Sequence, residues 1–231
     1  MINTEDKKTF ELLSASLTND AARAAYAEKS NTYRPSAIAQ TLGGLLIGMG
    51  TVVYGARPSY KKFRALEVIA RVPYHSWQAA AHTLLTIFYT NEKRAMKLMS
   101  LSNFARLSED NETMHVVVIS HIAKKECEGS FIFGTLMPLL FAFGYFWVAY
   151  WLYLINHRYA LELNYLFESH AHSQYEWFLK ENEAKLKGKN IESEYLKWYG
   201  RTPANQYEFF ESVRNDELIH RTTSVEKIRD L

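Results

Sequence analysis

Two short motifs in the sequence carry a carboxylate and an imidazole at the same spacing. They are Glu112 with His115, and Glu217 with His220. Residues three apart on an α-helix leave from one face, so both side chains of each pair can bind a single metal ion. Chance alone gives roughly one such pair in a chain of this composition, so neither pair is specific by itself.

Two further glutamates extend the pattern. Glu67 precedes the first pair and Glu168 the second, so the order is Glu, Glu-x-x-His, Glu, Glu-x-x-His. Four-helix bundles with a carboxylate-bridged metal pair use this ligand set, with a Glu from each of two helices and a Glu-x-x-His from each of the others. The sequence therefore predicts an all-α, ferritin-like four-helix bundle. A ligand set without thiolate favours two iron or manganese ions over zinc, and oxygen chemistry favours iron.

Composition and charge restrict the remaining classes. A chain of 231 residues with 48% hydrophobic residues is long enough for one large domain with a buried core. Its 27 basic and 25 acidic residues give no field that would attract nucleic acid. The single cysteine, Cys127, excludes an internal disulfide and indicates a reducing compartment. The first residues resemble neither a secretory signal nor a mitochondrial presequence.

Helical patterns and helix-breaking residues divide the chain into an N-terminal arm at 1–35 and a bundle at 36–228. The arm ends at Arg34-Pro35 and is expected to pack on a partner or a neighbouring element. Each of the four predicted bundle helices carries one part of the ligand pattern. They are 61–88 with a kink at Pro73, 91–125 ending before Gly129, 157–187, and 204–228.

Two apolar stretches, at about 38–54 and 131–155, contain no charged residue. The second is long enough to cross a bilayer. A single crossing would place the metal-binding helices on opposite sides of the membrane, where they could not form one bundle. We therefore expect these segments to form a membrane-facing surface, with 131–155 lying in one leaflet. A spanning helix is the alternative.

From about residue 61 to 225, the sequence around the ligand pattern resembles the alternative oxidases, which are the cyanide-insensitive quinol oxidases of mitochondria. LEVIARVP is similar to the family's Leu-Glu-Thr segment with its following Pro, and NETMH to its Asn-Glu-Arg-Met-His. FESHAHSQY is similar to its Leu-Glu-Glu-Glu-Ala segment ending in Tyr, and RNDELIH to its Arg-Ala-Asp-Glu-Ala-His-His.

The resemblance implies roles for individual residues. The iron ligands would be Glu67, Glu112, His115, Glu168, Glu217 and His220. Tyr175 would be the catalytic tyrosine, since it lies two helical turns beyond Glu168 on the same face. Asn111 and Asp216 would form hydrogen bonds around the site. Quinol would bind between the Glu67 and Glu168 helices, against Lys62, Leu66, Ala70, Phe167 and Ala171.

The implied activity is electron transfer from ubiquinol to O2 at the di-iron centre, giving water without proton pumping. The implied partners are ubiquinol or ubiquinone, O2, membrane lipid and a second copy of the chain in a homodimer, with respiratory-chain complexes as further candidates. The implied location is monotopic, on the matrix side of the mitochondrial inner membrane, or on a bacterial inner membrane.

The sequence departs from the family pattern near the ligands. Ser169 and His170 replace two carboxylates, Lys62 stands where many members carry Arg, and Arg221 replaces the second histidine of the last motif. These changes leave two other functions open. One is a di-iron monooxygenase resembling the demethoxyubiquinone hydroxylases, and the other is a non-catalytic oxidase-like subunit of a respiratory assembly.

Overall fold

The computed structural model describes residues 4–126 and 130–231. Cys127 and Gly129, and the expectations attached to them, lie outside the described residues. The described residues form helices and no strand, which confirms the all-α class. The helices are α1 Thr4–Ser16, α2 Asp20–Asn31, α3 Ala37–Tyr54, α4 Tyr60–Ala70, α5 Val72–Phe88, α6 Glu92–Glu126, the π-helical Ile132–Leu136, α7 Met137–Ile155, α8 His157–Lys187, α9 Glu194–Tyr199 and α10 Gln206–Arg229.

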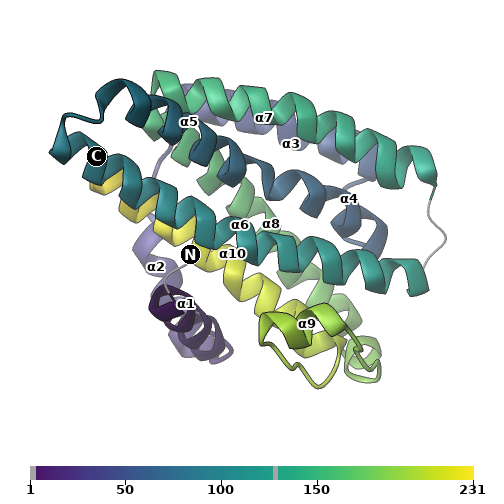
Figure 1. Cartoon of the computed structure of the whole chain (residues 1–231). Coiled ribbons are helices and arrows are strands. Elements are labelled where there is room, and N and C mark those ends of the chain that lie inside the picture. The colour runs from purple at the N-terminus through teal and green to yellow at the C-terminus, as the bar shows by residue number, and fades with distance from the viewer. Residues whose placement is uncertain (1–3, 127–129) are drawn as a thin grey trace.

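A bundle of four rods forms the centre of the molecule (Figure 1). The rods are α4 followed by α5, α6, α8 and α10, and the α8–α10 pair shares the most extensive contact. The bounds of α6, α8 and α10 lie within two residues of the predicted ranges. The predicted four-helix bundle is therefore confirmed.

The first rod differs from the prediction because it consists of two helices. A single kinked helix over 61–88 is wrong, since α4 ends at Ala70, Arg71 forms a turn, and α5 begins at Val72. Pro73 lies in the first turn of α5, where a residue without an N–H leaves no hydrogen bond unmade. The chain therefore restarts a helix at this proline.

Helices α3 and α7 cover the face of the bundle made by α4, α5 and α8 (Figure 1). Both are long and apolar enough to cross a membrane by length and composition, and few of their residues are buried inside the protein. Helix α3 lies close to α8 at Gly43, where a Cβ would stand 2.8 Å from Leu166 Cδ1. A side chain at this position could be accommodated only if Leu166 moved, so the glycine allows α3 to approach α8 closely.

The arm packs on the opposite side of the bundle, against α10 (Figure 1). Phe10 and Leu17 of α1 are buried with Leu218 and Ile219 of α10. The arm is expected to pack on a partner or on a neighbouring element, and the structure shows it on a neighbouring element of the same chain, α10. The short helix α9 is not predicted from the sequence, because six residues are too few to show a periodicity.

A buried glutamate holds the junction between the arm and α3 against α8. Glu162 is fully buried and accepts hydrogen bonds from Tyr33 Oη at 2.6 Å, Ser36 N at 3.1 Å, Ser36 Oγ at 2.5 Å and Arg158 Nε at 3.0 Å. Burial would raise the pKa of Glu162, but these hydrogen bonds outweigh it and lower the pKa below the usual 4.5.

A carboxylate with a lowered pKa stabilises the fold above its unfolded pKa and loses that contribution as the pH falls through the folded value. We therefore expect Glu162→Gln to lower the free energy of unfolding by about 2 kcal/mol at neutral pH. The difference from wild type should narrow below pH 4.5. Urea unfolding followed by circular dichroism at several pH values measures it, with Glu181→Gln in an exposed ion pair as control. A difference independent of pH would contradict this account.

Candidate metal centre

All six residues predicted as metal ligands meet at one point inside the bundle. None has more than 3% of its surface exposed. They form two groups of four, and within each group one ligand atom from every residue lies within 4.8 Å of the others. Both groups contain Glu112 and Glu217. One is completed by Glu67 and His115, the other by Glu168 and His220.

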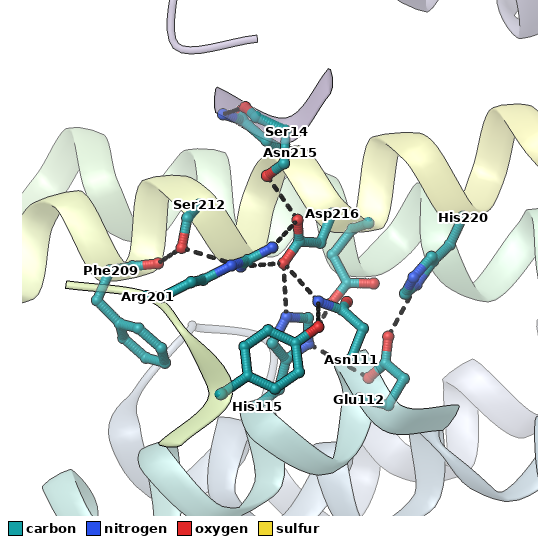
Figure 2. A network of polar contacts seen from close by, with 12 residues as sticks. Ser14, Asn111, Glu112, His115, Arg201, Phe209, Ser212, Asn215, Asp216 and His220 are labelled. Carbon is teal, nitrogen blue, oxygen red and sulfur yellow. Dashed lines mark hydrogen bonds and ion pairs between the residues drawn. The ribbon is translucent and has the colours of Figure 1, made fainter. Parts of the chain in front are cut away.

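Glu112 lies between the two imidazoles (Figure 2). Its Oε1 is 2.9 Å from His220 Nδ1, and its Oε2 is 3.4 Å from His115 Nδ1. His115 Nδ1 is also 3.5 Å from Glu67 Oε2 and 3.6 Å from Glu217 Oε1. One carboxylate thus presents an oxygen to each half of the site, which is the arrangement a bridging ligand requires.

Most of these ligand atoms have no hydrogen-bond partner among the described residues. They are both oxygens of Glu112 and of Glu217, Glu67 Oε2, His115 Nδ1 and both ring nitrogens of His220. The short contact between Glu112 and His220 lacks the angles of a hydrogen bond. An unsatisfied buried polar group costs about 1–3 kcal/mol, and more if it is charged. Two metal ions bound by this set would satisfy the carboxylate oxygens and one ring nitrogen of each histidine, so the residues fit such a pair.

The charges of the cluster support the same reading. Burial raises the pKa of Glu217 well above its usual value, and the nearby Glu112 and Glu168 raise it further. Burial would also raise the pKa of Glu112, but His115 and His220 outweigh it and bring that pKa to about 2. Because buried carboxylates this close cannot all ionise without cations, metal ions would take the place of the protons held here.

Asp216 organises the polar residues around His115 (Figure 2). His115 Nε2 and Asp216 Oδ2 are 3.0 Å apart, and Asn111 Nδ2 donates to the same oxygen at 3.0 Å. The imidazole therefore carries its proton on Nε2 and turns Nδ1 towards the glutamates, as a metal ligand must. Asn111 and Asp216, both predicted from the sequence, lie where they can orient a ligand.

Arg201 and Ser14 complete this network and are not predicted from the sequence. Arg201 donates to Asp216 at 2.5 and 3.0 Å and to Glu11 at 2.6 and 3.0 Å, and Ser14 Oγ donates to Asp216 Oδ1 at 2.6 Å. Arg201 follows Gly200, whose φ of +103° is a left-handed conformation. Sequence patterns report on residues a few positions apart. They therefore give no sign that Arg201 in this loop, or Ser14 in α1, contacts Asp216 in α10.

Two buried tyrosines contact the glutamates. The hydroxyl of Tyr175, which lies on α8, donates to Oε1 of Glu67, which lies on α4. The Tyr74 hydroxyl donates to Glu168 Oε1 at 2.6 Å. Tyr175 is predicted as the catalytic tyrosine, whereas Tyr74 is not predicted. Its signal is visible in hindsight, since Tyr74 follows Glu67 at the same interval at which Tyr175 follows Glu168.

An apolar cavity of about 360 Å³ lies between α3, α4, α7 and α8. All five positions predicted to bind quinol line it, namely Lys62, Leu66, Ala70, Phe167 and Ala171. Glu67, Glu168 and Tyr175 line it as well. The cavity therefore extends from the two apolar helices to one side of the candidate metal centre.

Lys62 lines the cavity, as His170 also does, and is only 2% exposed. Its Nζ donates to Gln174 Oε1 at 2.7 Å and to the carbonyl oxygen of Ala56 at 3.0 Å. Burial lowers the pKa of Lys62. These partners hold the ammonium group beside the cavity without neutralising its charge.

The fold and the site together define a helical-bundle protein with a buried carboxylate and imidazole cluster suited to metal ions. The chain belongs to the alternative oxidase family, which it matches over residues 28–227. It is also similar to Ubiquinol oxidase 4, chloroplastic/chromoplastic, of Arabidopsis thaliana, with 25% identity over 185 residues. That match covers 71% of this chain and 50% of the relative, so the chain spans about half the length of the curated relative it matches.

Loss of Arg201 should show how strongly the structure depends on the network around Asp216. We expect Arg201→Met to lower the free energy of unfolding by about 3–5 kcal/mol, because it leaves Asp216 buried without its charge partner. Arg57→Met removes an arginine from an exposed ion pair with Glu181 and should cost at most about 1 kcal/mol. Urea unfolding measures both, and equal losses would contradict the assigned importance of Arg201.

Proposed function

We propose that the protein is a ubiquinol oxidase that transfers electrons from quinol to O2 at a di-iron centre, giving water without pumping protons. The supporting observation is that the cavity ends at Glu67, Glu168 and Tyr175, which also border the candidate metal centre. The six glutamate and histidine residues of that centre would hold the metals. A bound iron pair would pass electrons to O2, and two quinols, each oxidised to quinone, would supply the four electrons and four protons that convert one O2 to two water molecules.

The cavity suits the ring of a quinol. Ala70 and Ala171 have small side chains that leave space for a ring near Glu67 and Glu168, and Leu66 and Phe167 provide apolar walls. Lys62 would donate a hydrogen bond from Nζ to a ring oxygen. This contact would orient the quinol, because the charged donor forms its strongest hydrogen bond with the more electron-rich of the ring oxygens.

Tyr175 lies where protons and electrons would pass between the cavity and the metal centre. Its ring stacks on Phe63 with centroids 4.1 Å apart and an angle of 13° between the rings. This packing holds Tyr175 Oη on Glu67 Oε1 while the same residue lines the cavity. We assign Tyr175 the role of catalytic tyrosine, which gives up a proton and an electron during O2 reduction and regains them from quinol.

Helices α3 and α7 would bring the protein to its lipid-soluble substrate. Large apolar side chains on both are exposed, including Val52 at 86% and Phe143 at 70%. Residues of both helices line the cavity, so quinol could enter from a lipid leaflet. We propose monotopic attachment, to the matrix side of the mitochondrial inner membrane or to a bacterial inner membrane. The Arabidopsis relative is named chloroplastic/chromoplastic, so similarity to it does not favour mitochondria.

The homodimer and any association with respiratory-chain complexes also stay proposals, based on the family resemblance.

The departures from the family pattern bear on the two rival functions. Ser169 Oγ donates to the carbonyl of Tyr165 in its own helix at 2.6 Å. Arg221 points to the arm, where it donates to Ser30 Oγ at 3.2 Å and Asn31 Oδ1 at 3.0 Å. Since these hydrogen bonds involve none of the six candidate ligands, both changes leave the ligand set intact, which favours a working oxidase over a non-catalytic subunit.

Oxygen consumption by the purified protein tests the proposed function. Full-length protein in lipid nanodiscs should contain about two iron ions per chain. It should consume O2 with ubiquinol as sole reductant in the presence of cyanide, and release water and unmodified quinone. A hydroxylated ring found by mass spectrometry would instead indicate the monooxygenase. Protein without iron from its native source would indicate the structural subunit.

Replacement of Lys62 tests the quinol site. We expect Lys62→Met to raise the KM for ubiquinol about tenfold with little change in kcat, because it removes one charged hydrogen bond from substrate binding. Lys61→Met, at the exposed neighbouring position, should leave both constants unchanged. A lower kcat with an unchanged KM would place Lys62 outside the substrate site.

A further inference from the structure

The two tyrosines of the metal centre are arranged reciprocally. In each of two rods a glutamate is followed seven residues later by a tyrosine, as Glu67 by Tyr74 and Glu168 by Tyr175. Seven residues are close to two helical turns, which puts Glu168 and Tyr175 on the same side of α8, whereas the turn at Arg71 separates Glu67 on α4 from Tyr74 on α5. Tyr175 donates to the glutamate of the other rod, Glu67, and Tyr74 donates to Glu168. The repeated ligand pattern thus includes a tyrosine in each repeat, and each tyrosine donates to the glutamate of the other repeat.

Tyr74 is held in this position by a second hydrogen bond. Asn164 Nδ2 donates to Tyr74 Oη at 2.9 Å and to Ser224 Oγ at 3.1 Å. Because Asn164 donates, the hydroxyl proton of Tyr74 is left for Glu168. Ser224 Oγ in turn donates to the carbonyl oxygen of His220 at 2.9 Å. The chain of contacts therefore connects Glu168 to the turn of α10 that carries another candidate ligand.

The ring of Tyr74 is fully buried among other rings. Tyr74 is 0% exposed and makes edge contacts with Trp77 at 5.4 Å, Phe104 at 5.9 Å and His220 at 5.5 Å between ring centroids. It is not among the described residues that line the cavity, whereas Tyr175 is. Tyr175 thus lines the cavity directly, whereas Tyr74 lies behind its two hydrogen-bond partners, Glu168 and Asn164, which do line the cavity.

The partners of the four glutamates divide them into two kinds. Glu112 and Glu217 have both oxygens unpartnered among the described residues, so each can offer two oxygens to metal ions. Glu67 and Glu168 each have Oε1 engaged by a tyrosine. The hydroxyl of a tyrosine would restrict such a glutamate to its other oxygen. A phenylalanine at position 74 would fill the same volume without this effect.

We infer that Tyr74 is a positioning residue of the candidate metal centre, whose hydroxyl holds Glu168 by Oε1 and leaves Oε2 as the oxygen that would bind metal. This inference rests on the proposed function only in requiring that the centre bind metal. The partnered tyrosines then differ in task. Tyr175 meets the substrate, and Tyr74 sets the orientation of one ligand.

Substitution of Tyr74 by phenylalanine tests this role in the iron-loaded, full-length protein. Loss of a residue that orients a metal ligand lowers metal affinity or activity by about 10- to 100-fold. We expect Tyr74→Phe to reduce iron affinity or kcat by that factor, with the KM for quinol unchanged. Mössbauer spectra should show a changed quadrupole splitting at one of the two iron sites. Tyr153→Phe is the matched control, since Tyr153 is 1% exposed and its hydroxyl is not bonded among the described residues.

A second variant keeps the inference testable if Tyr74→Phe does not fold. Asn164→Leu retains Tyr74 and removes the donor that orients its hydroxyl, so it should alter the same iron site to a smaller extent. Wild-type spectra, iron affinity and kcat in the folded variants would overturn the role of Tyr74 while leaving the proposed function intact. Failure of the wild-type protein to bind iron would overturn both. Iron binding without quinol oxidation would overturn the proposed function alone, because the spectra would still report on Glu168.

Discussion

The structure depends on one electrostatic constraint, which is that four carboxylates and two imidazoles share a volume from which water is excluded. Each of these residues is at most 3% exposed, and most of their ligand atoms have no hydrogen-bond partner among the described residues. Such a cluster is unfavourable unless cations balance it. The same property would favour metal binding, because bound cations would remove the repulsion that burial creates. The surrounding structure can be understood as a means of keeping these groups together.

Two apolar clusters enclose the site from either end of the bundle. One contains Phe63, Tyr175 and Phe210, and the other contains Tyr74, Trp77 and Leu161. Each cluster includes one tyrosine that turns its hydroxyl towards the glutamates. The aromatic rings exclude water and fix the position of the hydroxyl groups, so the rigidity of the core is transmitted to the ligands. Of these two tyrosines, only Tyr175 lines the cavity itself, which also reaches Glu67 and Glu168.

Parts of the chain outside the four rods also hold the site together. Asp216 accepts hydrogen bonds from Ser14 of α1 and from Arg201 of the loop before α10, and Arg201 also donates to Glu11 of α1. Asp216 in turn orients His115. A bidentate arginine and a carboxylate form a strong, directional contact when buried. The N-terminal arm is therefore connected to the candidate metal centre by hydrogen bonds that run from Ser14 through Asp216 to His115.

The sequence by itself was sufficient for the features that depend on local geometry. Three-residue spacing puts Glu112 with His115, and Glu217 with His220, on one helical face, and the long periodic stretches correspond to α6, α8 and α10 within two residues. Only the tertiary structure decided which residues meet across the bundle. Tyr175 bonds to Glu67 instead of Glu168 in its own helix, Arg201 and Ser14 reach Asp216, and α4 and α5 separate at Arg71. The reason is physical: helix periodicity constrains residues a few positions apart, whereas the relative shift and rotation of packed helices decides contacts between residues a hundred positions apart.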